Sequence, residues 1–361
     1  MSQRLEKIHI KGFKSIKTLD LSIKNLNVLI GSNGSGKSNF ISVFKFLRQL
    51  AEQRLQYSVR QRGGAERILH YGSRETPTLD IQLDFSPNVY NVVFSATQND
   101  GLFIVQEAIG QLNTHYDTPL WTSLGNGHVE SQLEKAAKEM PIADYVGRFL
   151  NSWRVYHFHD TSENAAVKKS NNVNDNLFLR EDAGNLAAFL YRMKAETPKH
   201  YERIVKTIEL VVPMFKDFLL RPDPLNTEMI RLEWLDKQSD YIFTVSDFSD
   251  GSLRFICLAT MLLQPNRPDL ILLDEPELGL HPSAINHLAG LLRKVSHLSQ
   301  LIVSTQSSDL VTQFNAEDII VVENKDRAST FRRLDAQKLE YWLKEYSLGE
   351  IWDKNIIGGR P

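Results

Sequence analysis

An eight-residue segment following an apolar run has the composition of a phosphate-binding loop. Glycines let backbone N–H groups curl around a phosphate without an interfering Cβ, and a helix that begins here adds N–H groups and a positive dipole end. In this pattern, GxxxxGK[ST], Lys37 would reach the β- and γ-phosphates of a nucleotide and Ser38 would ligate Mg²⁺. A plain Gly/Ser turn is the alternative. The segment consists of Gly31, Ser32, Asn33, Gly34, Ser35, Gly36, Lys37 and Ser38.

Two adjacent carboxylates follow a second apolar run. Residues 270–273 are all Leu or Ile, and Asp274 and Glu275 come directly after them. A carboxylate at the carboxyl end of a buried strand can hold Mg²⁺ directly or through water, which is the role predicted for Asp274. Glu275 points elsewhere and can polarise an attacking water as general base. A solvated loop after a core strand is the alternative, but a neighbouring phosphate loop favours catalysis.

A third candidate site precedes an apolar helix predicted for residues 253–263. Ser249, Asp250 and Gly251 stand at its amino end, and Pro265 follows its carboxyl end. Unpaired N–H groups at a helix terminus bind anions, and a glycine leaves them accessible. We therefore predict that Ser249 and Gly251 contact phosphate, although an ordinary N-capped core helix has the same pattern.

Alternating strands and helices must position these three sites. Apolar and polar residues alternate at 8–10, 19–23 and within 78–109, as in half-buried strands, whereas the apolar run 26–30 predicts a strand covered on both faces. Residues 111–244 change to a Gly-, Asn- and Lys-rich texture with a long helical region. The predicted organisation is α/β: an N-terminal half at 1–110, a mainly helical inserted lobe at 111–244 and a C-terminal half at 245–361.

Taken in order, the motifs resemble the heads of ABC-type ATPases of the RecF and SMC kind, including bacterial predicted ATPases of the AAA family. The phosphate loop with Asn39 resembles their first motif, and residues 12–15 (GFKS) resemble a turn near their N-terminus. Residues 248–252 (FSDGS) resemble a degenerate LSGGQ signature. Residues 272–277 (LLDEPE) and 279–282 (GLHP) are similar to the Walker B motif and D-loop. The likeness extends to residues 156–162 (YHFHDTS) and 358–361 (GGRP).

The resemblance implies an ABC-type P-loop head with a mixed sheet, an antiparallel N-terminal β-subdomain and a mainly helical insertion. It implies that Asn39 joins the nucleotide site. It also implies that Ser249 and Gly251 face the γ-phosphate held by a second copy, so that ATP with Mg²⁺ joins a homodimer.

Gln306 stands where such proteins carry a switch Gln or His, so the resemblance assigns catalysis to Glu275 and Gln306. Because a neutral Gln cannot carry a proton, we expect slow ATP hydrolysis. Gln61 and Gln82 are both candidates for the Q-loop glutamine.

The resemblance implies an ATP-gated switch that controls a separate, nuclease-like effector or a nucleic-acid clamp, in bacterial anti-phage defence or DNA maintenance. The energising subunit of a transporter is one alternative. A stand-alone nuclease is another, with Asp309, Glu323 and Lys325 as its faint acidic and basic pattern.

Composition and charge narrow the classes of protein to which this chain could belong. The 361 residues are 42% hydrophobic and 24% charged, with a net charge of −2, so no bulk positive field indicates nucleic-acid binding. One cysteine, Cys257, fits a reducing compartment and lies in an apolar run, where we expect a buried, inert thiol. We see no signal peptide and no run long enough to span a bilayer, and we expect a cytoplasmic protein without a membrane partner.

Four further clusters remain open between a functional and a structural interpretation. The His/Asp group could bind metal, the basic groups could contact nucleic acid, and the aromatic group could be core or a partner anchor. They are His157, His159 and Asp160; Arg60, Arg62 and Arg67; Lys168, Lys169, Arg332 and Arg333; and Tyr341, Trp342, Tyr346 and Trp352.

Overall fold

A six-stranded mixed sheet carries the strand ends at which the candidate site lies. The computed structural model describes residues 4–113 and 116–360, so that residues 1–3 and Pro361 of the GGRP segment lie outside it. The sheet order is β18-β17-β3-β16-β15-β8, and every neighbouring pair is parallel except β17 with β18. The strands are β3 (Leu26–Ile30), β8 (Arg154–Tyr156), β15 (Leu270–Asp274), β16 (Gln300–Thr305), β17 (Ile319–Lys325) and β18 (Ala328–Arg333).

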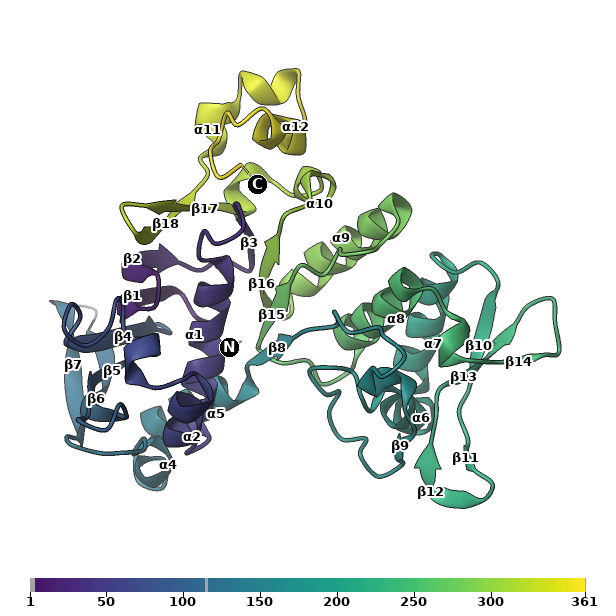
Figure 1. Ribbon diagram of the computed structural model, residues 1–361, viewed down its shortest axis with the longest axis horizontal. Helices are drawn as coiled ribbons and strands as arrows, with labels where there is room; N and C mark the ends of the chain where they lie inside the picture. Colours follow the sequence, from purple (N-terminus) through teal and green to yellow (C-terminus); the bar gives the residue numbers. More distant parts are fainter. Residues whose placement is uncertain (1–3, 114–115, 361) are drawn as a thin grey trace.

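A second, antiparallel sheet packs beside the first, with helix α1 (Lys37–Ala51) between them (Figure 1). One hydrophobic cluster joins α1, both sheets and helix α5 (Pro141–Ser152). The order is β2-β1-β4-β5-β6-β7. Its strands are β1 (Lys7–Phe13), β2 (Ile16–Ser22), β4 (Thr78–Asp84), β5 (Asn88–Ala96), β6 (Leu102–Asn113) and β7 (Tyr116–Gly125). Short helices α2 (Leu55–Gln61), α3 (Ala65–Ile68) and α4 (Leu133–Ala136) connect these parts.

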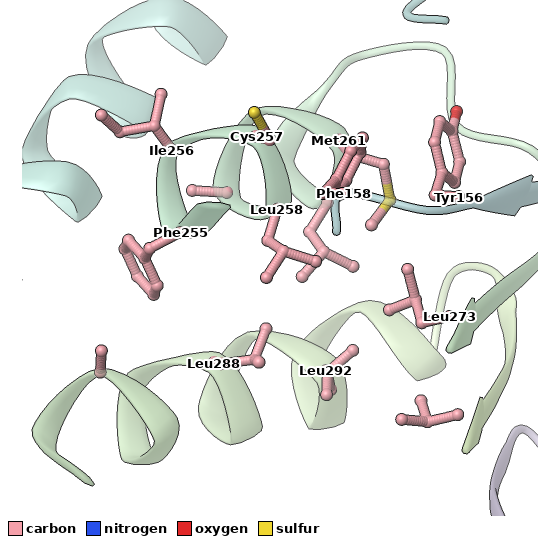
Figure 2. Packing of buried hydrophobic residues seen from close by; sticks show 14 of the residues in the cluster. Tyr156, Phe158, Phe255, Ile256, Cys257, Leu258, Met261, Leu273, Leu288 and Leu292 are labelled. Atoms are coloured by element: carbon pink, nitrogen blue, oxygen red, sulfur yellow. The ribbon is translucent and has the colours of Figure 1, made fainter. Parts of the chain in front are cut away.

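The other face of the mixed sheet is covered by α9 (Pro282–Ser296), and α8 (Asp250–Leu263) and α10 (Ser308–Thr312) pack on α9 within the same hydrophobic cluster. Strand side chains alternate between the faces: Val28 and Ile30 join this cluster, whereas Leu29 joins the cluster around α1. Figure 2 shows the buried side chains of α8 facing those of α9. Burial raises the pKa of the Cys257 thiol to about 12, which makes this thiol inert, as expected from the sequence.

A lobe on the far side of β8 holds two helices and two small sheets (Figure 1). The helices α6 (Leu186–Glu196) and α7 (Pro198–Glu209) pack against each other, and α7 packs on α8. One sheet has the order β10-β13-β14 and the other β11-β12-β9. Their strands are β9 (Asn171–Asn172), β10 (Phe215–Leu219), β11 (Pro222–Asp223), β12 (Asn226–Ile230), β13 (Glu233–Asp236) and β14 (Ile242–Thr244); short 3-10 turns are η1 (Ala166–Lys168) and η2 (Val245–Asp247).

The lobe differs from the mainly helical insertion expected at 111–244. The residues from 111 to 156 complete the antiparallel sheet with the ends of β6 and β7, add α5 to the core and supply β8 to the mixed sheet. The sequence pattern missed β7 because an edge strand with solvent on both faces has no apolar alternation, and it missed β8 because three residues give no period. The lobe itself has about as much strand as α-helix. The sequence pattern missed these strands too, because each of them is short.

After β18 the chain forms a small helical cap, which consists of α11 (Ala336–Leu339), η4 (Trp342–Lys344) and α12 (Leu348–Asp353). Helix α11 contacts the 3-10 turn η3 (Ala316–Asp318). The aromatic residues predicted as either core or partner anchors differ in their exposure. Trp352 is fully buried, whereas Tyr341 is 72% exposed. Trp352 is therefore a core residue, and the surface aromatic residues are Tyr341 and Trp342. The predicted α/β architecture, a mixed sheet with an antiparallel N-terminal sheet, is confirmed.

Candidate functional site

The phosphate loop connects β3 to α1 and is shaped by three glycines with positive φ: Gly31, Gly34 and Gly36. A Cβ at Gly31 would collide with the carbonyl oxygen of Val322, and one at Gly36 would collide with the side chain of Ser329. Both positions therefore need glycine, because a backbone carbonyl lies against Gly31 and a serine side chain lies against Gly36. The outcome is a loop whose N–H groups stay uncovered at the amino end of α1.

Lys37 and Ser38 occupy the first turn of α1. The Lys37 ammonium donates to the carbonyl oxygens of Gly31 at 2.6 Å and Ser32 at 3.0 Å, so it lies within the curve of the loop. Burial lowers the pKa of Lys37, and the nearby carboxylates of Glu275 and Asp274 oppose that shift. An anion placed in the loop would, like these carboxylates, favour the charged form of Lys37.

Asp274 reaches the loop from the end of β15. Its Oδ2 accepts from the Ser38 hydroxyl at 3.5 Å, and its Oδ1 accepts from the hydroxyl of Ser304 on β16. A hydroxyl and a carboxylate oxygen at the amino end of the phosphate-loop helix are hard oxygen ligands, which suit Mg²⁺. Ser304 was not identified from the sequence, because strand pairing alone brings it to Asp274.

Glu275 and Gln306 are in direct contact, as expected of two residues that share one reaction. The amide of Gln306 donates to Oε1 of Glu275, and the backbone N–H of Glu275 donates to the carbonyl of Ser304 at 2.9 Å. Glu275 has a φ of 43°, a left-handed backbone that non-glycine residues adopt at a cost. This backbone turns its carboxylate away from that of Asp274.

Glu277 is a buried carboxyl group that the sequence did not single out. It is 7% exposed, Thr305 donates to its Oε1 at 2.5 Å, and its Oε2 has no hydrogen-bond partner among the described residues. Burial raises the pKa of Glu277 to about 7, although hydrogen bonds from Thr305 and two backbone groups lower it. It lies behind Glu275 and contacts the strand that leads into Gln306.

We expect Glu277→Gln to flatten the pH dependence of stability. Because the folded-state pKa is near 7 and the unfolded value is near 4.5, the neutral carboxyl stabilises the fold fully below pH 4.5. That contribution, about 3 kcal/mol, is lost as the pH rises through 7. Urea unfolding of wild type and variant from pH 4.5 to 8 measures it, with the exposed Glu340→Gln as control. Parallel curves for wild type and Glu277→Gln would contradict the assignment.

The helix tip around Ser249 is ordered within its own chain. Ser249 caps α8 by accepting from the N–H of Ser252 at 3.2 Å, and among the described residues it makes no hydrogen bond to the phosphate loop. A Cβ at Gly251 would collide with the carbonyl oxygen of Gly279, in the loop after β15. Arg254 fastens the same corner by donating to the carbonyl of Leu278. The tip is thus braced against the loop that follows Asp274 and Glu275.

The segment after β8 also reaches the site. Because Tyr156 pairs with Leu273, the next residue, His157, lies at the same sheet edge as Asp274. Burial lowers the pKa of His157, the charge of Lys45 lowers it further, and Asp274 opposes both. Among the residues that the structure describes, no group of three or more His, Cys, Asp or Glu side chains could hold a metal ion, so His157, His159 and Asp160 form no such cluster.

The two Q-loop candidates lie away from this edge. Gln61 ends α2 and donates to the hydroxyl of Tyr57 at 2.5 Å. Gln82 lies in β4 and donates to Asp84 at 2.9 Å. The structure brings neither to Asp274, whereas His157 lies there.

Asn39 and residues 357–359 support the loop from outside. The amide of Asn39 donates to the Ser15 hydroxyl at 2.8 Å, which ties α1 to the turn between β1 and β2. Gly359 packs beside Gly31, and the indole N–H of Trp352 donates to the Gly359 carbonyl at 2.9 Å. Gly359, which belongs to the GGRP segment noted in the sequence without a role, is therefore part of the wall of the phosphate loop.

Several of the remaining candidate residues have structural partners. Lys325 pairs with Glu323 at 2.8 Å, and Glu323 also accepts from the N–H of Gly359, while Asp309 lies in the first turn of α10. Arg333 donates to Asn27 at 2.6 Å. These contacts are expected of a sheet edge and do not assemble the acidic site that a nuclease needs.

Comparison with known proteins identifies a family and a distant relative of this chain. A family model described as "AAA domain, putative AbiEii toxin, Type IV TA system" matches residues 26–312, which contain all the site residues predicted from the sequence. The Old nuclease of Escherichia phage P2 is 21% identical over 384 residues, covering 96% of this chain and 64% of the phage protein. The chain spans less than two thirds of the length of the curated relatives it matches.

Solved SMC heads have the same fold. The Smc head bound to the C-winged helix domain of ScpA is 17% identical, covers 93% of this chain and 99% of its own, and superposes with a TM-score of 0.58. The Smc head with an extended coiled coil, bound to the C-terminal domain of ScpA from Pyrococcus furiosus, is 15% identical, with coverages of 94% and 98% and a TM-score of 0.54. The predicted ABC/SMC-type head is confirmed as the fold.

Proposed function

This chain belongs to the AAA-domain family described as "putative AbiEii toxin, Type IV TA system", and from that premise we propose that it is an ATP-hydrolysing switch whose two copies close on ATP. One observation carries the proposal. The phosphate loop, the carboxylates and Gln306 meet at one sheet edge, whereas the helix tip at Ser249 makes no hydrogen bond to that loop among the described residues.

One copy supplies everything needed to hold and cleave the nucleotide. The N–H groups of the loop and Lys37 bind the phosphates, and Ser38 with Asp274 holds Mg²⁺, which neutralises phosphate charge when bound. Glu275 takes a proton from the attacking water as that water bonds to the γ-phosphorus. The bond from the γ-phosphorus to the β–γ bridging oxygen then breaks, and the products are ADP and inorganic phosphate.

Gln306 explains why we expect slow turnover. Its amide already donates to Glu275, so it can orient that carboxylate and the water but cannot accept a proton itself. The contact favours a role in sensing the γ-phosphate over a role in proton transfer.

The second copy supplies the anion site of the helix tip. β3 is separated from β15 by β16, so about 10 Å of sheet lies between the phosphate loop and the loop after β15 that braces the tip, at ~4.8 Å per strand. Ser249 is exposed, and the amino end of α8 carries a positive dipole end that Asp250 in its first turn partly offsets. Both features suit a phosphate presented by another copy, which makes ATP the contact between them.

The biological role is proposed from the relatives. A family description that names a toxin system and the likeness to a phage nuclease support a role in phage defence or DNA maintenance. An SMC head bound to a domain of ScpA supports control of a separate partner protein, whether effector or nucleic-acid clamp. A transporter subunit is the alternative, supported over a short part of the chain: a putative ABC transporter ATP-binding protein of Methanosarcina acetivorans is 32% identical over 27% of this chain. No helix in the described part of the chain is long and apolar enough to cross a membrane.

Mixing two defective variants tests the composite site. In a Glu275→Gln background, Lys37→Ala removes the loop function and Ser249→Arg blocks the helix tip. We expect each variant to stay monomeric at saturating Mg-ATP. A one-to-one mixture should form dimers. In a mixed dimer, one of the two composite sites joins the intact loop of the Ser249→Arg copy to the intact tip of the Lys37→Ala copy.

Analytical ultracentrifugation of the separate and mixed variants gives the measurement. Ser239→Arg, an exposed serine in the lobe, is the control and should dimerise alone. If the mixture stays monomeric while the control dimerises, the two sites do not face each other across copies, and the composite arrangement is wrong.

A further inference from the structure

Four non-glycine residues near the phosphate loop have a left-handed backbone. They are Lys14 (φ 47°), Tyr71 (φ 55°), Asp326 (φ 49°) and Arg327 (φ 65°). Such residues are uncommon and persist where the surrounding structure holds them, often at functional sites. The three segments that carry them are the β1–β2 turn, the turn after α3 and the β17–β18 turn.

Hydrogen bonds fasten these three segments to the phosphate loop and to one another. Ser329, two residues after Arg327, donates to the carbonyl of Ser35 in the loop, at 2.7 Å, and lies 2.7 Å from the Ser15 hydroxyl. The His70 imidazole donates through Nδ1 to the carbonyl of Lys14 at 2.6 Å. The turns are therefore neighbours of the loop on the side toward β17, away from Asp274 and Glu275.

Tyr71 and Arg327 form a flat pair at this place. The Arg327 guanidinium carbon lies 4.0 Å from the centroid of the Tyr71 ring, and His70 meets that ring edge-on at 4.7 Å. Tyr71 is nevertheless 48% exposed, so ring surface remains open. A guanidinium lying over the ring of a half-exposed tyrosine can serve as a stacking platform for a planar ligand.

Positive charge near the platform has no acidic partner. Lys14, Arg62 and Arg327 make no ion pair within 4.0 Å in the described part of the chain. Burial lowers the pKa of Lys14, and the charge of Arg62 lowers it further. Unpaired cations beside an aromatic platform suit a ligand with a planar base and an anionic chain.

We propose that the base of a purine nucleoside triphosphate stacks on the Tyr71–Arg327 pair while its phosphates enter the loop, with Lys14 beside the chain between them. The proposal rests on the proposed function and adds where the nucleoside half lies. Because stacking accepts any π face, it also sets the substrate class: adenine and guanine nucleotides bind about equally well.

Isothermal titration calorimetry with Mg-ATP, Mg-GTP and inorganic tripolyphosphate tests the platform. Tyr71→Ala should weaken ATP and GTP binding by about 5- to 100-fold, the usual effect of losing one base–aromatic stack. It should leave tripolyphosphate binding unchanged, because that ligand has no base. Tyr71→Phe should bind all three as wild type does. Tyr241→Ala, another exposed tyrosine, is the matched control.

The outcomes separate this proposal from the proposed function. If wild type binds ATP and Tyr71→Ala binds it equally well, the platform is wrong and the switch stands. If Tyr71→Ala loses tripolyphosphate as much as ATP, the pair only supports the loop, and the stacking role is overturned. If wild type binds no nucleotide, the proposed function itself fails. A preference of more than tenfold for ATP over GTP would refute the predicted substrate class.

Discussion

Lys37→Ala abolishes ATP binding and hydrolysis together: this is the largest effect that we expect from a single substitution. The ammonium lies inside the loop, 2.6 Å from the Gly31 carbonyl, where a bound β- or γ-phosphate oxygen would replace the carbonyl as its partner. A hydrogen bond between charged groups contributes about 1.5–3 kcal/mol, so losing two of them weakens binding about 100-fold or more. Calorimetric titration with Mg-ATP and a phosphate-release assay measure both quantities.

Two controls make this result specific. Lys11→Ala removes an exposed lysine from β1 and should leave binding and turnover unchanged. Thermal unfolding of Lys37→Ala should stay near that of wild type, since the ammonium bonds only to loop carbonyls and the change removes a buried charge. Wild-type turnover in a folded Lys37→Ala protein would overturn the site assignment.

Glu275→Gln should keep ATP binding and stop the reaction at the closed dimer. Glutamine has the same shape and can still accept from Gln306, but it cannot take the proton of the attacking water. We expect turnover to fall by about 10²- to 10⁴-fold, the usual contribution of a general base. Because closure needs ATP and opening needs its hydrolysis, the dimer should accumulate at saturating Mg-ATP.

Single-turnover hydrolysis and light scattering coupled to size exclusion provide the measurements. Glu317→Gln removes an exposed carboxylate and serves as the control, with wild-type turnover expected. Adding Lys37→Ala to Glu275→Gln should return the protein to monomer. A Glu275→Gln protein that binds ATP and remains monomeric would count heavily against the switch.

The hydrogen bond between Gln306 and Glu275 links the nucleotide to the rest of the fold. Gln306 follows β16 and precedes α10, which packs on α12 of the cap. Thr305, one residue earlier, holds the buried Glu277 at 2.5 Å. A shift of Gln306 when the γ-phosphate leaves would therefore be felt in the cap, whose exposed residues include Tyr341 and Trp342. This route favours the cap as the place where a partner reads the state of the switch.

The sequence by itself determined the parts of the site that are continuous along the chain. The loop from Gly31 to Ser38, and the pair Asp274 and Glu275, each lie within one strand–turn unit, where composition and spacing reflect local backbone geometry. The α/β class followed from the same local periods, whereas the antiparallel N-terminal sheet was implied by the resemblance. The resemblance placed Gln306 and the helix tip at Ser249 in order along the chain.

Only the tertiary structure decided which distant side chains meet. Parallel pairing of β15 with β16 brings Ser304 to Asp274 and Gln306 to Glu275, and the fold alone buries Glu277 and stacks Arg327 on Tyr71. The boundary expected at residue 111 failed for the same physical reason: an edge strand such as β7 is defined by its hydrogen-bonded neighbour, not by a buried face of its own. Local patterns record burial, whereas partners are set by packing between segments that are far apart in the chain.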